Sequence, residues 1–157
     1  MTAVEHVRDS VPKHERPAFA HWHLILLVFL GGAIGTSGRE GLSLALPANG
    51  GIPYAVLIVN ILGAFILGFL LTALGRVKPE SPRRRDLRLF AGTGMMGGFT
   101  TYSSLATDTA TLFEKNAPLA VGYATFSVVA GFAAAALGIW LAGRLPAPAS
   151  TSTGAGA

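Results

Sequence analysis

One stretch, residues 92–104, holds the side chains and backbone of this sequence that are best suited to binding an ion. It places four glycines within seven residues and follows them with Thr, Thr, Tyr, Ser and Ser. Gly and hydroxyl residues weaken a helix, and apolar sequence flanks the stretch on both sides. In hydrocarbon, a loosened backbone persists only where it is buried in protein or lines a polar cavity. The stretch therefore predicts a broken membrane helix and a site for an ion or small solute.

The other polar side chains at membrane depth are mostly neutral hydrogen-bond donors. Asn60 lies in the middle of an apolar segment, and Tyr123 and Ser127 are four residues apart, so they share one helix face. An intramembrane Asn can hydrogen-bond a neighbouring helix or present its amide to an anion, and its spacing leaves both open. Arg39 lies towards the end of another apolar segment, where it could influence an entrance.

This inventory suits a small, strongly hydrated anion, because N–H groups, O–H groups and aromatic ring edges can replace its water. The donors are Asn60, Thr100, Thr101, Tyr102, Ser103, Ser104, Tyr123 and Ser127. Carbonyls released by a broken helix could hold Na⁺. Catalysis is poorly supported, because the sequence has no Cys and no paired carboxylates or Ser–His pair at membrane depth. We therefore expect an ion pathway and not an enzyme.

The composition places these residues in a membrane protein. Of 157 residues, 51% are hydrophobic and 13% are charged, against about 25% charged in an ordinary soluble domain, and mean hydropathy is +0.52. A soluble chain of this length could not bury so much apolar surface. We predict an all-α integral membrane fold with four transmembrane helices, the third broken at mid-membrane. The predicted spans are residues 22–46, 54–74, 89–113 and 118–145.

The predicted domain is a four-helix membrane channel domain over residues 21–145. Residues 1–20 are predicted to be a disordered cytoplasmic tail and residues 146–157 a disordered C-terminal tail. Ten of the 12 lysine and arginine residues fall on the side of the two tails and the basic loop, residues 76–88, while Arg39 and Lys115 fall on the other. This bias predicts a multi-pass protein of the plasma membrane (the cell inner membrane in a two-membrane cell) with both termini cytoplasmic. The basic residues lie between apolar blocks, so no nucleic-acid partner is expected.

Three local patterns together resemble the Fluc (CrcB-type) fluoride channels. They are Gly31-Gly32-Ala33-Ile34-Gly35 followed by Arg39, Val59-Asn60-Ile61-Leu62-Gly63-Ala64-Phe65 with Gly68, and Gly97-Gly98-Phe99-Thr100-Thr101-Tyr102-Ser103. The resemblance covers residues 24–141. It implies a four-helix subunit that pairs antiparallel with a second subunit in the lipid bilayer, forms fluoride pores and exports fluoride passively, which confers fluoride resistance. It also implies a structural Na⁺ at the dimer interface.

The resemblance also assigns roles to individual residues. It places the Na⁺-binding backbone carbonyls on Gly97 and Thr100, the vestibule arginine on Arg39 and the pore asparagine on Asn60. Thr101 joins the fluoride pathway with the hydroxyl residues of the break. Tyr102 and Leu105 occupy two positions where the family usually has phenylalanines whose ring edges meet fluoride. Tyr123 and Ser127 match the start of a polar track on the fourth helix.

Two departures lead to a hypothesis about the partner. Leu105 has no aromatic edge, and a homodimer of opposed subunits requires a weak lysine and arginine bias, whereas this bias is ten to two. We therefore favour pairing with a related subunit of opposite orientation over pairing of the chain with itself. Two other functions are open to a chain with four short membrane spans. A small multidrug-type exporter should carry a carboxylate in its first span, and residues 22–38 have none. A non-conducting structural partner subunit of a fluoride channel heterodimer would explain the glycines by packing alone.

Overall fold

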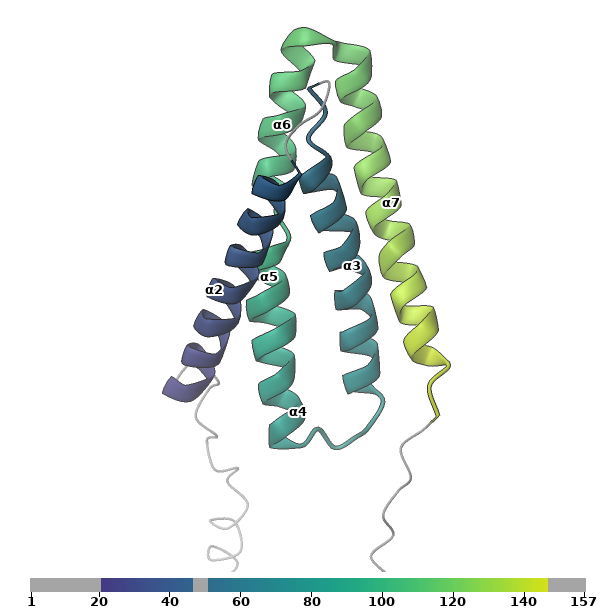
Figure 1. Cartoon of the computed structure of the whole chain (residues 1–157). Coiled ribbons are helices and arrows are strands. Elements are labelled where there is room, and N and C mark those ends of the chain that lie inside the picture. The colour runs from purple at the N-terminus through teal and green to yellow at the C-terminus, as the bar shows by residue number, and fades with distance from the viewer. Residues whose placement is uncertain (1–20, 47–50, 147–157) are drawn as a thin grey trace, which may run out of the picture.

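Helices make up nearly all of the chain that the computed structural model describes, which is residues 21–46 and 51–146 (Figure 1). The elements are α2 (Trp22–Ala45), α3 (Tyr54–Gly75), α4 (Pro82–Leu87), the π-helix η2 (Arg88–Met95), α5 (Met96–Phe99), α6 (Tyr102–Lys115) and α7 (Ala117–Gly143). Because α4, η2 and α5 follow one another without a gap, they form one helical rod. The predicted tails, apart from Pro146, lie outside the described residues.

Two helices, α6 and α7, start at a residue whose side chain caps them, and α4 starts at a proline. The Asn116 side chain accepts a hydrogen bond from the Leu119 N–H at 3.1 Å at the start of α7. Thr101 caps α6 in the same way, and α4 begins with Pro82 after Ser81. Polar N-caps satisfy amides that have no partner within the helix, and proline fits the first helical position.

The rod of α4, η2 and α5 packs against α2, while α3 packs against α7 and α6 against α7. The chain passes up and down the bundle, and α6 continues in the direction of the rod after a break (Figure 1). Both ends of the described chain lie at the same end of the bundle as the connection between α3 and α4. This agrees with the predicted placement of the chain ends beside the basic loop.

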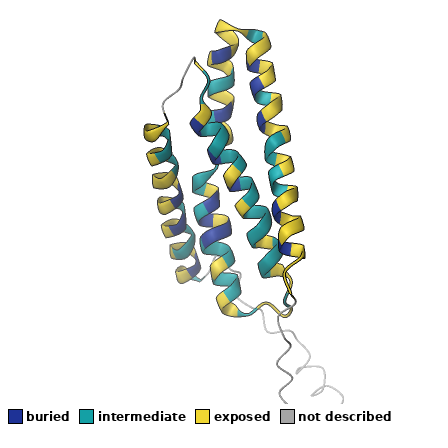
Figure 2. Cartoon of the chain, turned by 45° about the vertical axis from the view of Figure 1, so that its right-hand side comes forward, coloured by how far each residue is buried: buried dark blue, intermediate teal, exposed yellow. Residues whose placement is uncertain are grey.

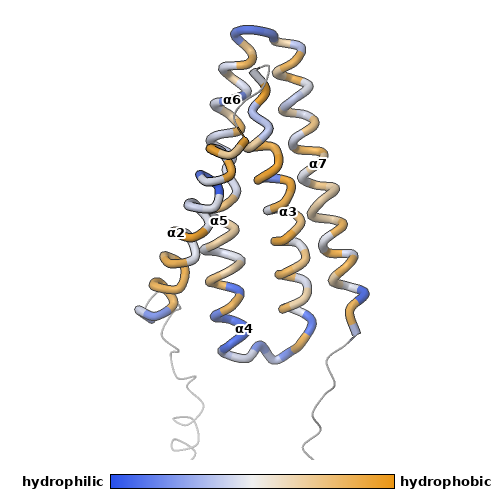
Figure 3. Tube along the Cα trace, viewed as in Figure 1, coloured by the Kyte–Doolittle hydropathy of each residue, from blue (hydrophilic) through white to orange (hydrophobic). Residues whose placement is uncertain are grey.

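Two helices, α3 and α7, are by themselves long and apolar enough to cross a membrane. The predicted first and third spans do not pass the same test. Helix α2 carries Arg39 and Glu40, and the break leaves α6 with 14 residues. Hydrophilic segments nevertheless gather at the two ends of the bundle, at the connection before α4 and at the turn between α6 and α7 (Figure 3).

Glycines bring α2 and the rod into backbone contact. A Cβ atom at Gly31 would overlap the Phe90 carbonyl oxygen, and one at Gly35 would overlap that of Met95. From the other side, a Cβ atom at Gly94 would lie 2.6 Å from the Val28 carbonyl oxygen. The glycines four apart on the first helix, Gly31 and Gly35, therefore mediate close packing.

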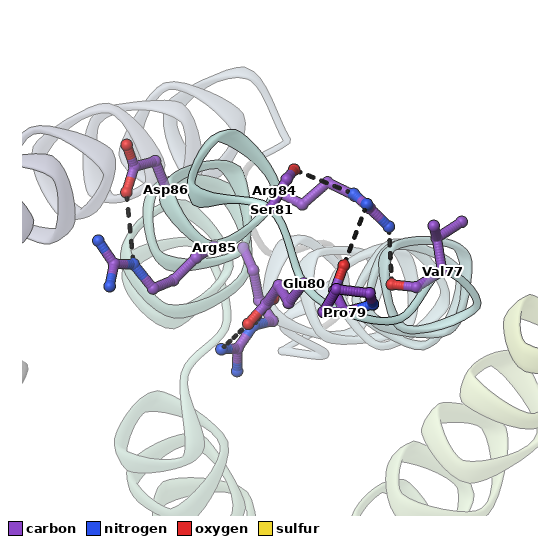
Figure 4. A network of polar contacts seen from close by, with 8 residues as sticks. Val77, Pro79, Glu80, Ser81, Arg84, Arg85 and Asp86 are labelled. Atoms are coloured by element: carbon purple, nitrogen blue, oxygen red, sulfur yellow. Dashed lines mark hydrogen bonds and ion pairs between the residues drawn. The ribbon is translucent and has the colours of Figure 1, made fainter. Parts of the chain in front are cut away.

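The basic loop is shorter than predicted, because helix begins at Pro82 and the arginines from Arg83 onward are helical. The sequence interpretation missed the Ser81–Pro82 helix start. Figure 4 shows how this end is held together. The Arg84 guanidinium donates to the Val77 carbonyl at 2.7 Å and to the Ser81 hydroxyl at 3.2 Å. Arg88 forms a two-point ion pair with Glu80, at 2.9 and 3.0 Å.

A small buried cluster fills the space between α6 and α7. It consists of Leu105, Leu112, Ala120 and Tyr123. Elsewhere buried residues occupy narrow stripes along the helices, and exposed residues cover much of the outer surface (Figure 2). Many of the exposed side chains are large and apolar, among them Phe29, Phe126 and Phe132. Such a surface is suited to lipid or to a second subunit.

Candidate ion site at the helix break

The predicted break is present, and it occupies two residues, Thr100 and Thr101. Their backbones are extended, with φ and ψ of −80° and 154° at Thr100 and −151° and 118° at Thr101. The glycines before them remain helical, although η2 is wound as a π-helix. Such π segments within α-helices are frequent at functional sites. The glycines therefore permit close packing of the rod, and the interruption itself falls on the threonines.

The Asn60 side chain on α3 spans the break by bonding both backbone groups of Thr101. The Thr101 N–H donates to Asn60 Oδ1 at 2.8 Å, and Asn60 Nδ2 donates to the Thr101 carbonyl at 3.0 Å. The carboxamide thus replaces two hydrogen bonds that a continuous helix would have made within itself. Because an amide nitrogen carries two hydrogens, Asn60 keeps a second N–H for another acceptor. Of the two roles left open by the sequence, bonding to a neighbouring helix is observed.

The carbonyls of residues 97–100 lose their helical partners at the break, and for two of them the amide is donated to a side chain. In a continuous α-helix the Gly97 carbonyl would accept from the Thr101 N–H, which is instead donated to Asn60. The Thr100 carbonyl would accept from the Ser104 N–H, which is donated to Thr101 Oγ1 at 3.1 Å. These are the two residues predicted to supply carbonyl ligands to Na⁺. The described residues contain no cluster of His, Asp or Glu suited to a metal, so backbone oxygens are the relevant donors for a cation here.

The hydroxyl groups of the break form a compact network. Thr101 Oγ1 lies 3.1 Å from Ser103 Oγ and also donates to Ser104 Oγ at 3.1 Å. Thr100 Oγ1 donates to the Met96 carbonyl at 2.9 Å, which also receives the Thr100 N–H at 2.9 Å. These bonds fix the rotamers of both threonines, so the backbone at the break has one defined conformation.

A pocket of about 260 Å³ opens at the break. It is lined by Asn60, Thr100, Thr101, Tyr102 and Leu105. Tyr102 is 82% exposed, whereas Leu105 is 9% exposed and belongs to the buried cluster. The fold therefore brings five of the predicted site residues to one pocket, lined by neutral side chains and open on the side of Tyr102.

The remaining predicted residues lie elsewhere. Tyr123 and Ser127 are buried on one face of α7, as their spacing predicted. The Tyr123 hydroxyl donates to the Pro53 carbonyl at 3.3 Å, and Ser127 Oγ donates to the Tyr123 carbonyl at 2.7 Å. Arg39 is on α2, outside the residues that line the pocket, and its buried Nε has no hydrogen-bond partner within the described chain. Their proposed roles in a fluoride pathway stay predictions.

One residue at the break was missed by the sequence interpretation. Thr36 Oγ1 on α2 donates to the Gly98 carbonyl at 3.4 Å. Its sequence signal is its position four residues after Gly32, on the helix face that packs closely against the rod. A hydroxyl at that spacing can reach a backbone carbonyl of the neighbouring helix only where both helices carry glycine.

The fold and the break define a helical protein with two candidate membrane spans and an open pocket where one helix is interrupted. Comparison with known proteins gives its family. The family model described as "CrcB-like protein, Camphor Resistance (CrcB)" matches residues 26–139. The chain is 45% identical over 135 residues to the fluoride-specific ion channel FluC 2 of Leifsonia xyli subsp. xyli, covering 85% of this chain and 90% of that relative. It is 41% identical over 125 residues to FluC of Mesorhizobium japonicum, covering 78% of this chain and 98% of the relative.

FluC of Deinococcus radiodurans is similar to the same degree, at 41% identity over 127 residues, covering 78% of this chain and 97% of the relative. The chain therefore belongs to the CrcB/FluC fluoride channel family, as the sequence motifs predicted. This is a family of membrane ion channels and not of enzymes, and membership sets aside the multidrug-type alternative.

Proposed function

We propose that this chain is a subunit of a fluoride-selective channel that lowers cytoplasmic fluoride by passive export. The observation that carries the proposal is the pocket at the helix break, where Asn60, Thr101 and Tyr102 meet in a chain whose relatives are named fluoride-specific channels. The pocket lining contains no charged side chain. A lysine or arginine side chain in such a place would hold fluoride too tightly for conduction, because an ion must leave as readily as it enters.

Fluoride needs donors in place of its water, and the break supplies them in neutral form. The second N–H of the Asn60 amide and the positive edge of the Tyr102 ring are two of the groups that the pocket lining offers. Thr101 holds its hydrogen bonds to Ser103 and Ser104. Tyr123 and Ser127 would continue the path along α7, and Arg39 would attract fluoride to an entrance.

The donor set also fits a structural Na⁺. The carbonyls of Gly97 and Thr100 have lost their helical amides, and carbonyl oxygens are suitable ligands for a hard cation. When bound, Na⁺ would neutralise these carbonyl dipoles and tie the break together. Two carbonyls are few for a cation, so an antiparallel second subunit that adds two more would complete the site. This places Na⁺ at the interface of a dimer.

The pairing we favour is with a related subunit of opposite orientation. Seven of the nine lysine and arginine residues of the described chain lie within residues 76–88 or directly after α7, at the end of the bundle that holds the α3–α4 connection (Figure 1). This bias favours a single orientation with both termini cytoplasmic in the plasma membrane. Leu105 lines the pocket without an aromatic edge. A partner with phenylalanine there would supply the missing edge and leave one fully competent pore.

The test is fluoride efflux from liposomes that contain this chain alone, with an affinity tag whose exposure on each membrane face is measured. We expect weak efflux and tags on one face only, and full efflux after coexpression with an oppositely biased relative. Robust efflux by the chain alone with tags on both faces would refute the heteromeric pairing and retain the channel. Absence of fluoride efflux under both conditions would refute the channel.

A further inference from the structure

At the break, some backbone carbonyls accept a hydrogen bond from a side chain and others do not. The Met96 carbonyl accepts from Thr100, the Gly98 carbonyl from Thr36 and the Thr101 carbonyl from Asn60. The carbonyls of Gly97, Phe99 and Thr100 accept none of these bonds, and the helical amides of Gly97 and Thr100 are donated elsewhere. The choice of carbonyls available to a cation therefore depends on side chains from two other helices.

Thr36 is the contribution of α2 to this arrangement. A Cβ atom at Gly98 would overlap the Gly32 carbonyl oxygen and would lie 2.9 Å from Thr36 Oγ1. The absence of a side chain at Gly98 therefore lets the Thr36 hydroxyl approach the backbone of α5. At Gly97 an added Cβ would meet no atom within 4 Å. The two consecutive glycines thus differ: Gly98 is pressed against α2, and Gly97 faces open space.

We propose that Thr36 is a positioning residue for the cation site, which holds the Gly98 carbonyl on α2 so that the Gly97 and Thr100 carbonyls are the pair presented to Na⁺. This inference rests on the Na⁺ site of the proposed function. A tether on the Gly98 carbonyl restricts the neighbouring peptide unit that carries the Gly97 carbonyl, because only φ and ψ of Gly98 separate the two planar units. Without the Thr36 hydrogen bond, the Gly97 carbonyl could change direction, and Na⁺ binding would carry the entropic cost of ordering it.

The experiment measures thermal unfolding of the purified, assembled protein at a series of Na⁺ concentrations, with N-methyl-D-glucamine holding ionic strength constant. Thr36→Val keeps the branched shape and removes the hydroxyl, while Thr36→Ser keeps the hydroxyl. Ser37→Ala removes the neighbouring exposed hydroxyl and serves as the matched control. We expect the Na⁺ concentration at half-maximal stabilisation to rise about two- to tenfold in Thr36→Val, the range for one lost hydrogen bond. Thr36→Ser and Ser37→Ala should retain the value of the unmodified chain.

The comparison of midpoints separates positioning from packing. A simple packing defect would lower the unfolding temperature of Thr36→Val equally at every Na⁺ concentration and leave the midpoint unchanged, which would overturn the role of Thr36 while the Na⁺ site stands. If Thr36→Ser raises the Na⁺ concentration at half-maximal stabilisation as much as Thr36→Val does, the positioning role is also overturned, because Thr36→Ser keeps the hydroxyl. If the unmodified chain shows no Na⁺ dependence, the Na⁺ site fails and the Thr36 inference fails with it, whereas fluoride efflux still tests the channel.

Discussion

Replacing Asn60 with leucine tests the central geometry of the break. The change removes two hydrogen bonds, of 2.8 and 3.0 Å, and leaves the N–H and C=O of Thr101 without their partners. Thr101 is 8% exposed. A buried polar group left unpaired costs about 1–3 kcal/mol, which sets an upper range of about 2–6 kcal/mol for the pair. Interhelical hydrogen bonds within membranes average only about 0.6 kcal/mol each.

We expect a cost between these limits, about 1–3 kcal/mol, because water in the open pocket can replace part of the lost bonding. The same substitution removes the amide N–H from the fluoride pathway. A rise of about 1.4 kcal/mol in a barrier lowers a rate about tenfold, so fluoride efflux should fall by at least that factor.

The assay is fluoride efflux from liposomes, measured with a fluoride electrode, together with size-exclusion chromatography of the assembled protein. Asn116→Leu is the matched control. It removes an asparagine that caps α7, at a cost of about 1 kcal/mol, and should leave efflux unchanged. Wild-type efflux in Asn60→Leu would refute the pathway assignment. Loss of assembly, with efflux falling only in proportion to it, would show that Asn60 acts through packing.

Four other substitutions, of which Gly122→Ala is a control, test three separate parts of the structure. Gly94→Ala places a Cβ atom 2.6 Å from the Val28 carbonyl oxygen and should destabilise the protein by about 1–3 kcal/mol. At Gly122 an added Cβ atom meets no atom within 4 Å, so Gly122→Ala should stabilise the protein by up to about 1 kcal/mol. Thermal unfolding measures both changes. Arg39→Ala should weaken fluoride conduction at low fluoride concentration without abolishing selectivity, and equal conduction at all concentrations would dismiss the vestibule role. Arg84→Ala should make the α3–α4 connection sensitive to protease while efflux continues, and unchanged protease resistance would show that its hydrogen bonds do not hold that segment.

The course of the chain followed from simple sequence features. The predicted first, second and fourth spans agree with α2, α3 and α7 to within two residues at each end, because apolar runs of this length and helix-ending loops leave little choice of boundary. The basic loop was predicted too long. Its arginines are good helix formers, and the Ser81–Pro82 start outweighed the charge pattern that suggested a loop.

The position of the break could be predicted only to within a segment. Glycine clusters indicate weak helix, but the glycines of the third span remain helical, since their lack of side chains is used for contact with α2. The threonines are extended because Asn60, 41 residues away in sequence, bonds the backbone of Thr101. No local propensity encodes that distant partner. A similar reason explains why Thr36 was missed.

The break lies between two helices, α2 and α3, which contact it through different groups. On one side, α2 packs closely against the backbone at Gly98, and its Thr36 hydroxyl donates a hydrogen bond to the Gly98 carbonyl. On the other side, the Asn60 side chain of α3 forms two hydrogen bonds with the Thr101 backbone. The extended Thr100 lies between these two attachments, so any relative movement of α2 and α3 must change the backbone that carries the released carbonyls. Occupation of those carbonyls by a cation would therefore stabilise the packing of α2, α3 and α5 as a unit. Because Asn60 also lines the pocket, stability in Na⁺ and passage of fluoride should be coupled through this one side chain.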